Sequence, residues 1–148
     1  CTPKGIVELL KANSVRLEGL TAAVIGRSEI VGWPMAWMLT RENATVTVCH
    51  SKTRNIDEII RNSDLVVAAA GVPHFVNESM LKEGAIVIDV GIHRNESGKL
   101  IGDVNPEGFS EKNISHSPVP GGVGPMTVST LVANLIELYK IKANKTDH

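Results

Sequence analysis

The residues with the clearest chemical potential lie in a glycine-containing turn between a strand and a helix. The apolar run over residues 21–25 predicts a buried strand that ends at Gly26, and Gly32 follows near the start of a predicted helix. The unpaired amides and positive potential of a helix N-terminus favour a phosphate group. Arg27 and Ser28 add side-chain donors beside it. The spacing departs from the dinucleotide fingerprint G-x-G-x-x-G, so an ordinary strand-to-helix turn stays open as the alternative.

The end of the next predicted strand, over residues 44–49, indicates which ligand this turn would bind. An NAD-binding domain carries Asp or Glu there, roughly 20 residues beyond its glycines, to bind the ribose 2′-hydroxyl. This chain reads Cys-His-Ser-Lys-Thr over residues 49–53 and has no carboxylate. Ser51, Lys52 and Arg27 would suit an adenosine 2′-phosphate instead. Lys52 taken alone is more simply a surface lysine, but the missing acid and Arg27 together favour NADP over NAD.

Two further strand ends carry small residues that let a ligand or another backbone come close. The strand predicted at residues 64–69 continues into Ala-Gly-Val-Pro, and the strand predicted at residues 85–90 continues into Gly-Ile. Parallel sheets bind ligands beyond the carboxyl ends of their strands. Gly71 and Gly91 therefore either border the ligand or are plain turn glycines, and the sequence leaves both interpretations open.

The most unusual stretch is a proline- and glycine-rich segment before the longest predicted helix. Residues 118–127 read Pro-Val-Pro-Gly-Gly-Val-Gly-Pro-Met-Thr. Prolines restrict the backbone and glycines free it, so this loop is rigid at some points and permissive at others. Thr127 lies near the start of the helix predicted at residues 125–141, where we expect its hydroxyl to face the ligand cleft. Along that helix the residues expected to point inward include Met126, Leu131, Leu135 and Leu138.

The elements that position these residues alternate between strand and helix. The predicted strands are nearly continuous apolar runs, which is typical of a parallel sheet covered by helices on both faces. Right-handed crossovers then give an α/β fold with a doubly wound, mainly parallel sheet, as in Rossmann-like domains. The other predicted elements are helices at residues 30–41, 55–62 and 77–81, a polar hairpin or loop at 94–103 and a last strand at 114–119.

A single domain is expected at residues 1–141, followed by a polar tail at residues 142–148. Its first 18 residues are predicted as a helix and a linker. Thr2 is expected to cap that helix, with Pro3 in its first turn.

Composition excludes several classes of function. The 148 residues carry a formal net charge of −1, whereas a protein that coats nucleic acid would have a basic surplus. Aromatic residues make up only 3%, so there is no stacking platform for single strands. No apolar run approaches the ~18 residues of a membrane span, so we expect no membrane partner. Two cysteines make no disulfide framework and indicate a reducing compartment. No metal site is expected.

Five motifs together resemble one known family. They are Cys1-Thr-Pro-Lys-Gly5, Gly26-Arg-Ser-Glu-Ile-Val-Gly32, Cys49-His-Ser-Lys-Thr53, Val90-Gly-Ile92 and the segment 118–127. In this order, over nearly the whole chain, they resemble the NADP-binding domain of bifunctional methylenetetrahydrofolate dehydrogenases/methenyltetrahydrofolate cyclohydrolases. The string Pro-Gly-Gly-Val-Gly-Pro-Met-Thr is the most specific of the five.

The resemblance assigns roles to several residues already singled out. It implies that the first three members of the turn bind the cofactor's phosphates, that Ser51 contacts the adenosine ribose or its 2′-phosphate, and that Ile92 contacts the nicotinamide side. Pro120 and Gly121 would border the folate pocket. With the candidates from the preceding paragraphs, the expected cofactor residues are Gly26, Arg27, Ser28, Ser51, Lys52, Gly71, Ile92 and Thr127.

The same resemblance implies that part of the enzyme lies outside this chain. In that family an N-terminal domain carries the catalytic lysine, a folate-stacking tyrosine and an aspartate for the pterin. No lysine here matches the catalytic motif, so we expect no catalytic residue in this chain. The family oxidises 5,10-methylenetetrahydrofolate with NADP and hydrolyses the methenyl product to 10-formyltetrahydrofolate. We expect this chain alone to bind cofactor and to do little chemistry, because hydride transfer needs both reactants held together.

Two other functions stay open at this point. One is an NADP-dependent dehydrogenase of the shikimate or glutamyl-tRNA reductase type, and the other is a non-catalytic module for cofactor binding or dimerisation. The resemblance also implies a homodimer formed through this domain, with residues 94–103 as a contact. A cytoplasmic location is expected, with an organelle as the alternative.

Overall fold

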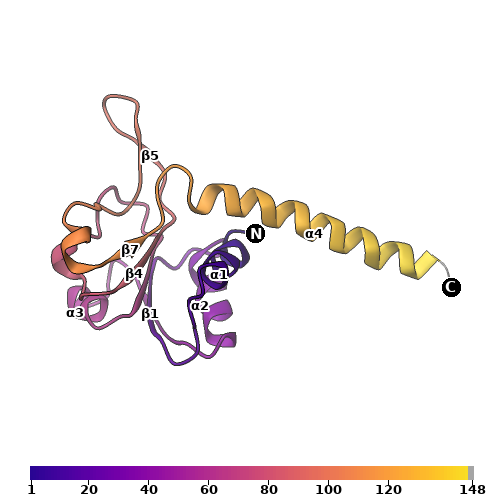
Figure 1. Ribbon diagram of the computed structural model, residues 1–148, viewed down its shortest axis with the longest axis horizontal. Coiled ribbons are helices and arrows are strands. Elements are labelled where there is room, and N and C mark those ends of the chain that lie inside the picture. Colours follow the sequence, from indigo (N-terminus) through magenta and orange to yellow (C-terminus); the bar gives the residue numbers. More distant parts are fainter. Residues whose placement is uncertain (147–148) are drawn as a thin grey trace.

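A five-stranded parallel sheet forms the centre of the computed structural model, which describes residues 1–146 (Figure 1). The strands lie in the spatial order β2 (Thr45–Cys49), β1 (Thr21–Ile25), β3 (Leu65–Ala68), β4 (Ile86–Asp89) and β7 (Ser115–His116). Every neighbouring pair is parallel. The order places β1 and β3 in the middle and requires the chain to wind in both directions from β1. The predicted doubly wound α/β fold is therefore confirmed.

Helices cover both faces of this sheet. The helical elements before the last strand are α1 (Thr2–Ala12), α2 (Gly32–Arg41), α3 (Ile56–Arg61) and the 3₁₀ turns η1 (Glu78–Met80) and η2 (Phe109–Lys112). One buried cluster joins α1 and α2 to one face, and a second joins α3, η1 and η2 to the other. Strand β3 contributes to both clusters because successive side chains of a strand point to opposite faces of the sheet. Leu65 and Val67 belong to the first cluster, and Val66 and Ala68 belong to the second. The continuous apolar runs thus supply two cores.

A carboxylate at the amino end of β3 joins the sheet to the loop before β4. The Asp64 side chain accepts a hydrogen bond from the Thr21 backbone N–H at 2.8 Å and forms an ion pair with Lys82. The hydrogen bond from Lys82, followed by the one from Thr21, lowers the pKa of Asp64. Asp64 therefore stabilises the amino edge of the sheet, opposite the edge at which the predicted ligand residues lie.

The segment between β4 and β7 contains the predicted hairpin. Strands β5 (His93–Arg94) and β6 (Leu100–Ile101) pair antiparallel and project away from the sheet. Figure 1 shows this hairpin rising from the body of the molecule. Strand β7 is shorter than predicted, since only two residues of the predicted strand 114–119 pair with β4.

The last helix, α4 (Val123–Thr146), differs most from expectation. Only its first turns lie on α1, and the remainder extends into solvent (Figure 1). Leu131, Leu135 and Leu138 are more than half exposed, so the prediction that they point inward is wrong, while Met126 is partly buried. The reason is that periodicity shows an apolar face but not the surface that covers it.

The contact between α4 and α1 depends on small and polar residues. A Cβ atom on Gly5 would lie 2.9 Å from the Met126 carbonyl oxygen, so glycine lets the two helices approach closely. Lys4 donates a hydrogen bond to Asn134 at 2.8 Å, about two turns beyond Met126 along α4. The close approach fixes the direction in which α4 leaves the domain.

Three predicted boundaries are corrected. Cys1, not Thr2, is the N-cap of α1, and it makes no side-chain capping bond. Helix α2 begins at Gly32, two residues later than predicted. The predicted polar tail over residues 142–148 begins inside α4, which continues to Thr146, and residues 147–148 lie outside the described residues. Within the described part of the chain, no helix has both the length and the apolar character needed to cross a membrane.

Candidate functional site

The predicted phosphate turn lies at the carboxyl end of the central strand β1. Gly26 follows β1 with a φ of +123° and donates its backbone N–H to the Cys49 carbonyl at 2.8 Å. A Cβ atom on Gly26 would collide with the Ala69 carbonyl at the end of β3, and one on Gly32 would collide with the Gly26 carbonyl. Both glycines are therefore required by close backbone approach. The turn folds tightly although it lacks the usual spacing.

Ser28 already uses the start of helix α2. Its Oγ accepts hydrogen bonds from the backbone N–H groups of Val31 at 3.2 Å and Gly32 at 3.3 Å. These are two of the amides that we expected to be free for a phosphate. Both bonds are long and the Ser28 side chain is exposed, so a phosphate oxygen can take over these donors when the hydroxyl turns. Arg27 is exposed beside them.

The end of β2 forms a tight turn that presents Ser51 and Lys52 to solvent. The Thr53 hydroxyl accepts from the His50 N–H at 2.8 Å, and the Thr53 N–H donates to the His50 carbonyl. His50 Nδ1 accepts from the Lys52 N–H at 3.1 Å. Ser51 and Lys52 are exposed at the tip, and within residues 1–146 their side chains form no hydrogen bond or ion pair. The backbone of this turn is fixed, while its two polar side chains remain available.

The cysteine beside this turn is a buried thiol. Cys49 is fully buried as the last residue of β2, and burial raises the pKa of its thiol. The thiolate, which is the reactive form, is thus disfavoured at neutral pH.

The next two strand ends bring Gly71 and Ile92 to the same edge of the sheet. Gly71 has a φ of +70° and is exposed, and a Cβ atom there would meet nothing within 4 Å. Ile92 follows β4 with 64% of its surface exposed. Its exposed side chain offers an apolar surface at this edge of the sheet. With the order β2, β1, β3 and β4, the four ends form a continuous row of ligand candidates.

Behind this row lies a buried polar network that sequence reasoning missed. Asp89 accepts from the N–H groups of Gly91, Asp103 and Val104 at 2.9–3.1 Å, and its own N–H donates to Ser117. Burial raises the pKa of Asp89, although these three N–H groups act to lower it. The sequence signal was weak: the same three residue types occur as Asp-Val-Gly at 89–91 and as Gly-Asp-Val at 102–104.

The second carboxylate of this network, Asp103, is completely buried. Its Oδ2 accepts from the Gly71 N–H at 2.8 Å, and its Oδ1 lies 2.7 Å from His93 Nε2. Asp103 therefore connects the end of β3 to the residue that follows Ile92.

The proline-glycine segment forms the loop into α4. Pro120 and Gly121 are exposed, and Gly121 has a φ of +102°. Gly122 is buried, and a Cβ atom there would press on the Pro118 carbonyl at 2.5 Å. The Thr127 hydroxyl donates to the Val123 carbonyl at 3.1 Å and shares a hydrogen bond with Thr2 of α1 at 3.0 Å. The hydroxyl that we expected to face a ligand is thus engaged in packing α4 on α1.

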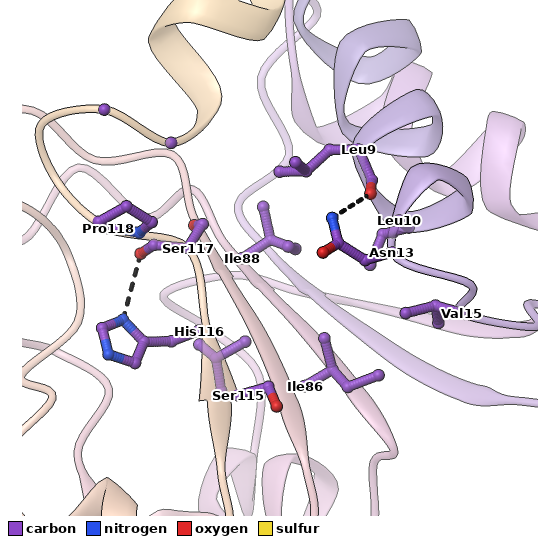
Figure 2. Close-up of a pocket in the computed structure, with 13 residues that line it drawn as sticks. Leu9, Leu10, Asn13, Val15, Ile86, Ile88, Ser115, His116, Ser117 and Pro118 are labelled. Atoms are coloured by element: carbon purple, nitrogen blue, oxygen red, sulfur yellow. Dashed lines mark hydrogen bonds between the residues drawn. The ribbon is translucent and has the colours of Figure 1, made fainter.

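A cavity of about 410 Å³ lies on the other side of this loop, between α1 and the edge of the sheet. Figure 2 shows Ile86 and Ile88 of β4 on one side of it, with Leu9 of α1 and Asn13, the C-cap of α1, on the facing side. Gly121 reaches its rim, but Pro120 is not among its lining residues. The cavity follows the length of β4 rather than its carboxyl end. It is therefore separate from the row of strand-end candidates.

Among residues 1–146, no three or more His, Cys, Asp or Glu side chains gather in a way that could hold a metal ion. The strand ends offer backbone amides, hydroxyls and cationic side chains, which suit an anionic ligand.

Comparison with known proteins gives a consistent result. The profile of the family described as tetrahydrofolate dehydrogenase/cyclohydrolase, NAD(P)-binding domain, matches residues 1–143. A bifunctional protein FolD from Campylobacter curvus is 55% identical over 143 residues, which are 97% of this chain and 50% of the relative. The mitochondrial C-1-tetrahydrofolate synthase of Schizosaccharomyces pombe is 54% identical over 144 residues, 95% of this chain but 15% of the relative.

Solved structures agree with the sequence matches. The bifunctional FolD methylenetetrahydrofolate dehydrogenase/cyclohydrolase from Campylobacter jejuni superposes with a TM-score of 0.92 at 50% identity, over 96% of this chain and 50% of that one. The Trypanosoma brucei enzyme, solved with NADP cofactor and inhibitor, has a TM-score of 0.88 at 43% identity, over 97% of this chain and 51% of that one. The chain spans about half the length of most of these relatives.

Proposed function

The chain belongs to the tetrahydrofolate dehydrogenase/cyclohydrolase family, and from this premise we propose that it is the NADP-binding part of a bifunctional enzyme. That enzyme oxidises 5,10-methylenetetrahydrofolate to 5,10-methenyltetrahydrofolate and hydrolyses this product to 10-formyltetrahydrofolate. Family membership favours this function over the shikimate or glutamyl-tRNA reductase type. A non-catalytic module remains the alternative that experiment must exclude.

The observation that carries the proposal is the row of strand ends at one edge of the sheet. Exposed Ser51 and Lys52 at the end of β2 fit an adenosine 2′-phosphate, because no carboxylate repels it there. The Gly26 turn and the amides of α2 fit the pyrophosphate. Gly71 and Ile92, at the ends of β3 and β4, then lie where the nicotinamide half of the cofactor would bind. The residues present therefore fit an extended NADP molecule from end to end.

Each group in this row has a distinct task. Bound NADP supplies the hydride acceptor of the oxidation. Arg27 and Ser28 bind its phosphates, and Ile92 packs an apolar side chain against the nicotinamide and excludes water from it. Pro120 and Gly121 border the folate, and Thr127 supports the loop from the start of α4 while remaining a cofactor candidate.

The folate site requires a second half, which we assign to the part of the relatives that this chain does not span. The apolar face of α4 supports this assignment. Eight large apolar side chains along it are about half exposed or more: Val128, Leu131, Val132, Leu135, Ile136, Leu138, Tyr139 and Ile141. So many exposed apolar groups on one helix are typical of a surface that another domain covers. We propose that this face packs against the second half, which brings folate to the row of strand ends.

Restoring the second half should convert cofactor binding into turnover. We expect the chain alone to reduce no NADP⁺ with 5,10-methylenetetrahydrofolate. Fusion of the N-terminal half of the Campylobacter curvus relative ahead of Cys1 should give NADPH formation, followed by absorbance. The added half alone is the control. A fusion that is folded and binds NADP⁺ but shows no NADPH formation would support the non-catalytic module instead.

We also propose that the protein is a homodimer in which the β5–β6 hairpin is a contact. The hairpin supports this because it extends beyond the body of the domain (Figure 1) with exposed polar residues. Light scattering at tens of micromolar should give twice the chain mass of 15.9 kDa. Deletion of residues 95–99 should shift this mass to that of a monomer, and a monomeric wild type would contradict the proposal.

A further inference from the structure

Two buried carboxylates lie directly behind the strand ends that carry Gly71 and Ile92. Asp103 is 0% exposed and Asp89 is 4% exposed. A Cβ atom on Gly91 would overlap the Asp103 carboxylate, and a Cβ atom on Gly102 would overlap the Asp89 carboxylate. Each carboxylate thus fills the space that the glycine of the other segment leaves open. The two segments thus each contribute one aspartate and one glycine to this reciprocal packing.

The two oxygens of Asp103 hold two different turns in place. Oδ2 accepts the Gly71 N–H at 2.8 Å, which fixes the end of β3. Oδ1 lies 2.7 Å from Nε2 of His93 and directly against Gly91. Ile92 therefore lies between two residues that both contact Asp103.

Asp89 fixes Asp103 in turn. One of its oxygens accepts the N–H groups of Gly91 and Asp103, and the other accepts the N–H of Val104. The backbone that carries the Asp103 side chain is thereby attached to the end of β4. A carboxylate held in this way has one orientation, so the turns it bonds have one position.

We propose that Asp103 is a positioning residue for the nicotinamide half of the cofactor, an inference that rests on the proposed function. Because its side chain is completely buried, Asp103 does not touch the ligand; it acts through Gly71 and Ile92. The adenosine half is placed by the ends of β2 and β1. Within residues 1–146, none of the side chains or amides of those two turns bonds to Asp103 or Asp89. The effect of Asp103 is therefore confined to one half of the ligand.

The test compares two ligands by calorimetric titration of the full chain. NADP⁺ carries both halves, whereas 2′,5′-ADP carries the adenosine and its 2′-phosphate but no nicotinamide. We expect Asp103→Ala, which removes the bonds to both Gly71 and His93, to weaken NADP⁺ binding about tenfold, because the two turns lose their fixed position, and to change 2′,5′-ADP affinity less than about twofold. Equal losses for both ligands, or no loss, would overturn the inference.

Asp103→Asn separates position from charge. Its amide can accept the Gly71 N–H and donate to His93 Nε2, so the turns stay in place although the negative charge is gone. We expect this variant to keep NADP⁺ affinity within about threefold of the wild type. A loss equal to that of Asp103→Ala would mean that Asp103 acts by its charge on the cationic ring, and positioning would be refuted.

Two further variants serve as a control for the loss of a carboxylate and as a replacement for Asp103→Ala. Asp64→Ala removes a carboxylate that bonds a backbone N–H at the opposite edge of the sheet, so it should lower stability and leave the ratio of the two affinities unchanged. If Asp103→Ala does not fold, His93→Ala is tested in its place. His93 is partly exposed, and its replacement removes the bond between His93 and Asp103 while leaving the Asp103 side chain present. An unchanged ratio in His93→Ala would then overturn the inference.

The wild-type titrations distinguish failure of the inference from failure of the proposed function. Binding of neither ligand would refute the proposed cofactor site and the inference with it. Equal affinity for NADP⁺ and 2′,5′-ADP would refute the inference alone, since the nicotinamide half would then contribute nothing.

Discussion

Replacing Gly26 with alanine is expected to destabilise the chain by about 3 kcal/mol or more and to abolish cofactor binding. Two costs combine at this position. The backbone φ of +123° is one that side chains rarely adopt, and the new Cβ would collide with the Ala69 carbonyl. Gly26 lies between the ends of β2 and β3, so relief of the clash must open the sheet at its centre. Chemical denaturation and NADP⁺ titration measure the two effects.

Gly84→Ala is the matched control for this prediction. Gly84 also has a positive φ, +72°, but a Cβ atom there meets nothing within 4 Å. The cost should then be that of the backbone conformation alone, about 1 kcal/mol, with cofactor binding retained. If Gly26→Ala is no more damaging than Gly84→Ala, the close approach to Ala69 does not constrain the turn.

Ser51→Asp is expected to reverse the cofactor preference. It restores a carboxylate at the end of β2, where NAD-binding domains carry one, and that carboxylate would face the 2′-phosphate of NADP. Juxtaposed like charges cost several kcal/mol, so NADP⁺ affinity should fall about 100-fold while NAD⁺ affinity is unchanged or higher. Competing calorimetric titrations with the two cofactors measure this directly.

Lys52→Ala and a change of salt provide the complementary test. Removal of the exposed ammonium should weaken NADP⁺ about tenfold at low salt, and less at moderate salt, because salt screens exposed charges. Ser110→Asp and Lys140→Ala, at exposed positions on η2 and α4, control for net charge. A wild-type preference for NAD⁺, or an equal loss of both cofactors in Ser51→Asp, would show that the end of β2 is misassigned.

The proposed two-part enzyme explains why α4 has so exposed an apolar face. A helix that packs only on its own domain has one buried stripe, yet Thr130 is the only buried residue beyond the first turn among those α4 residues, up to 144, whose burial the structure describes. The small residues at the α1–α4 contact hold the helix in a fixed direction, which presents its apolar face to the second half. At the same helix start, the Thr127 hydroxyl donates to the carbonyl of Val123 in the proline-glycine segment and shares a hydrogen bond with Thr2 of α1.

Local pattern predicted the central strands and the tight turn that follows β1. Apolar runs of strand length, separated by helix signals, gave β1 through β4 to within two residues at each end. Gly26, Gly32 and the absence of an acid after β2 are also readable from short spacing, because each depends on residues that are near in the chain. The family resemblance followed from the same short motifs.

The contacts that only the tertiary structure shows join residues that are distant in the sequence. Asp103 meets Gly71 across 32 positions, and Thr127 meets Thr2 across 125. The direction in which Ser28 and Thr127 use their hydroxyls, and the exposure of Leu131 and Leu135, also depend on which surfaces come together. Periodicity records which side of an element is apolar, but not what lies opposite it. The sequence by itself therefore determined the sheet and the kind of ligand its turns suit, and tertiary packing decided which buried carboxylates hold those turns in place.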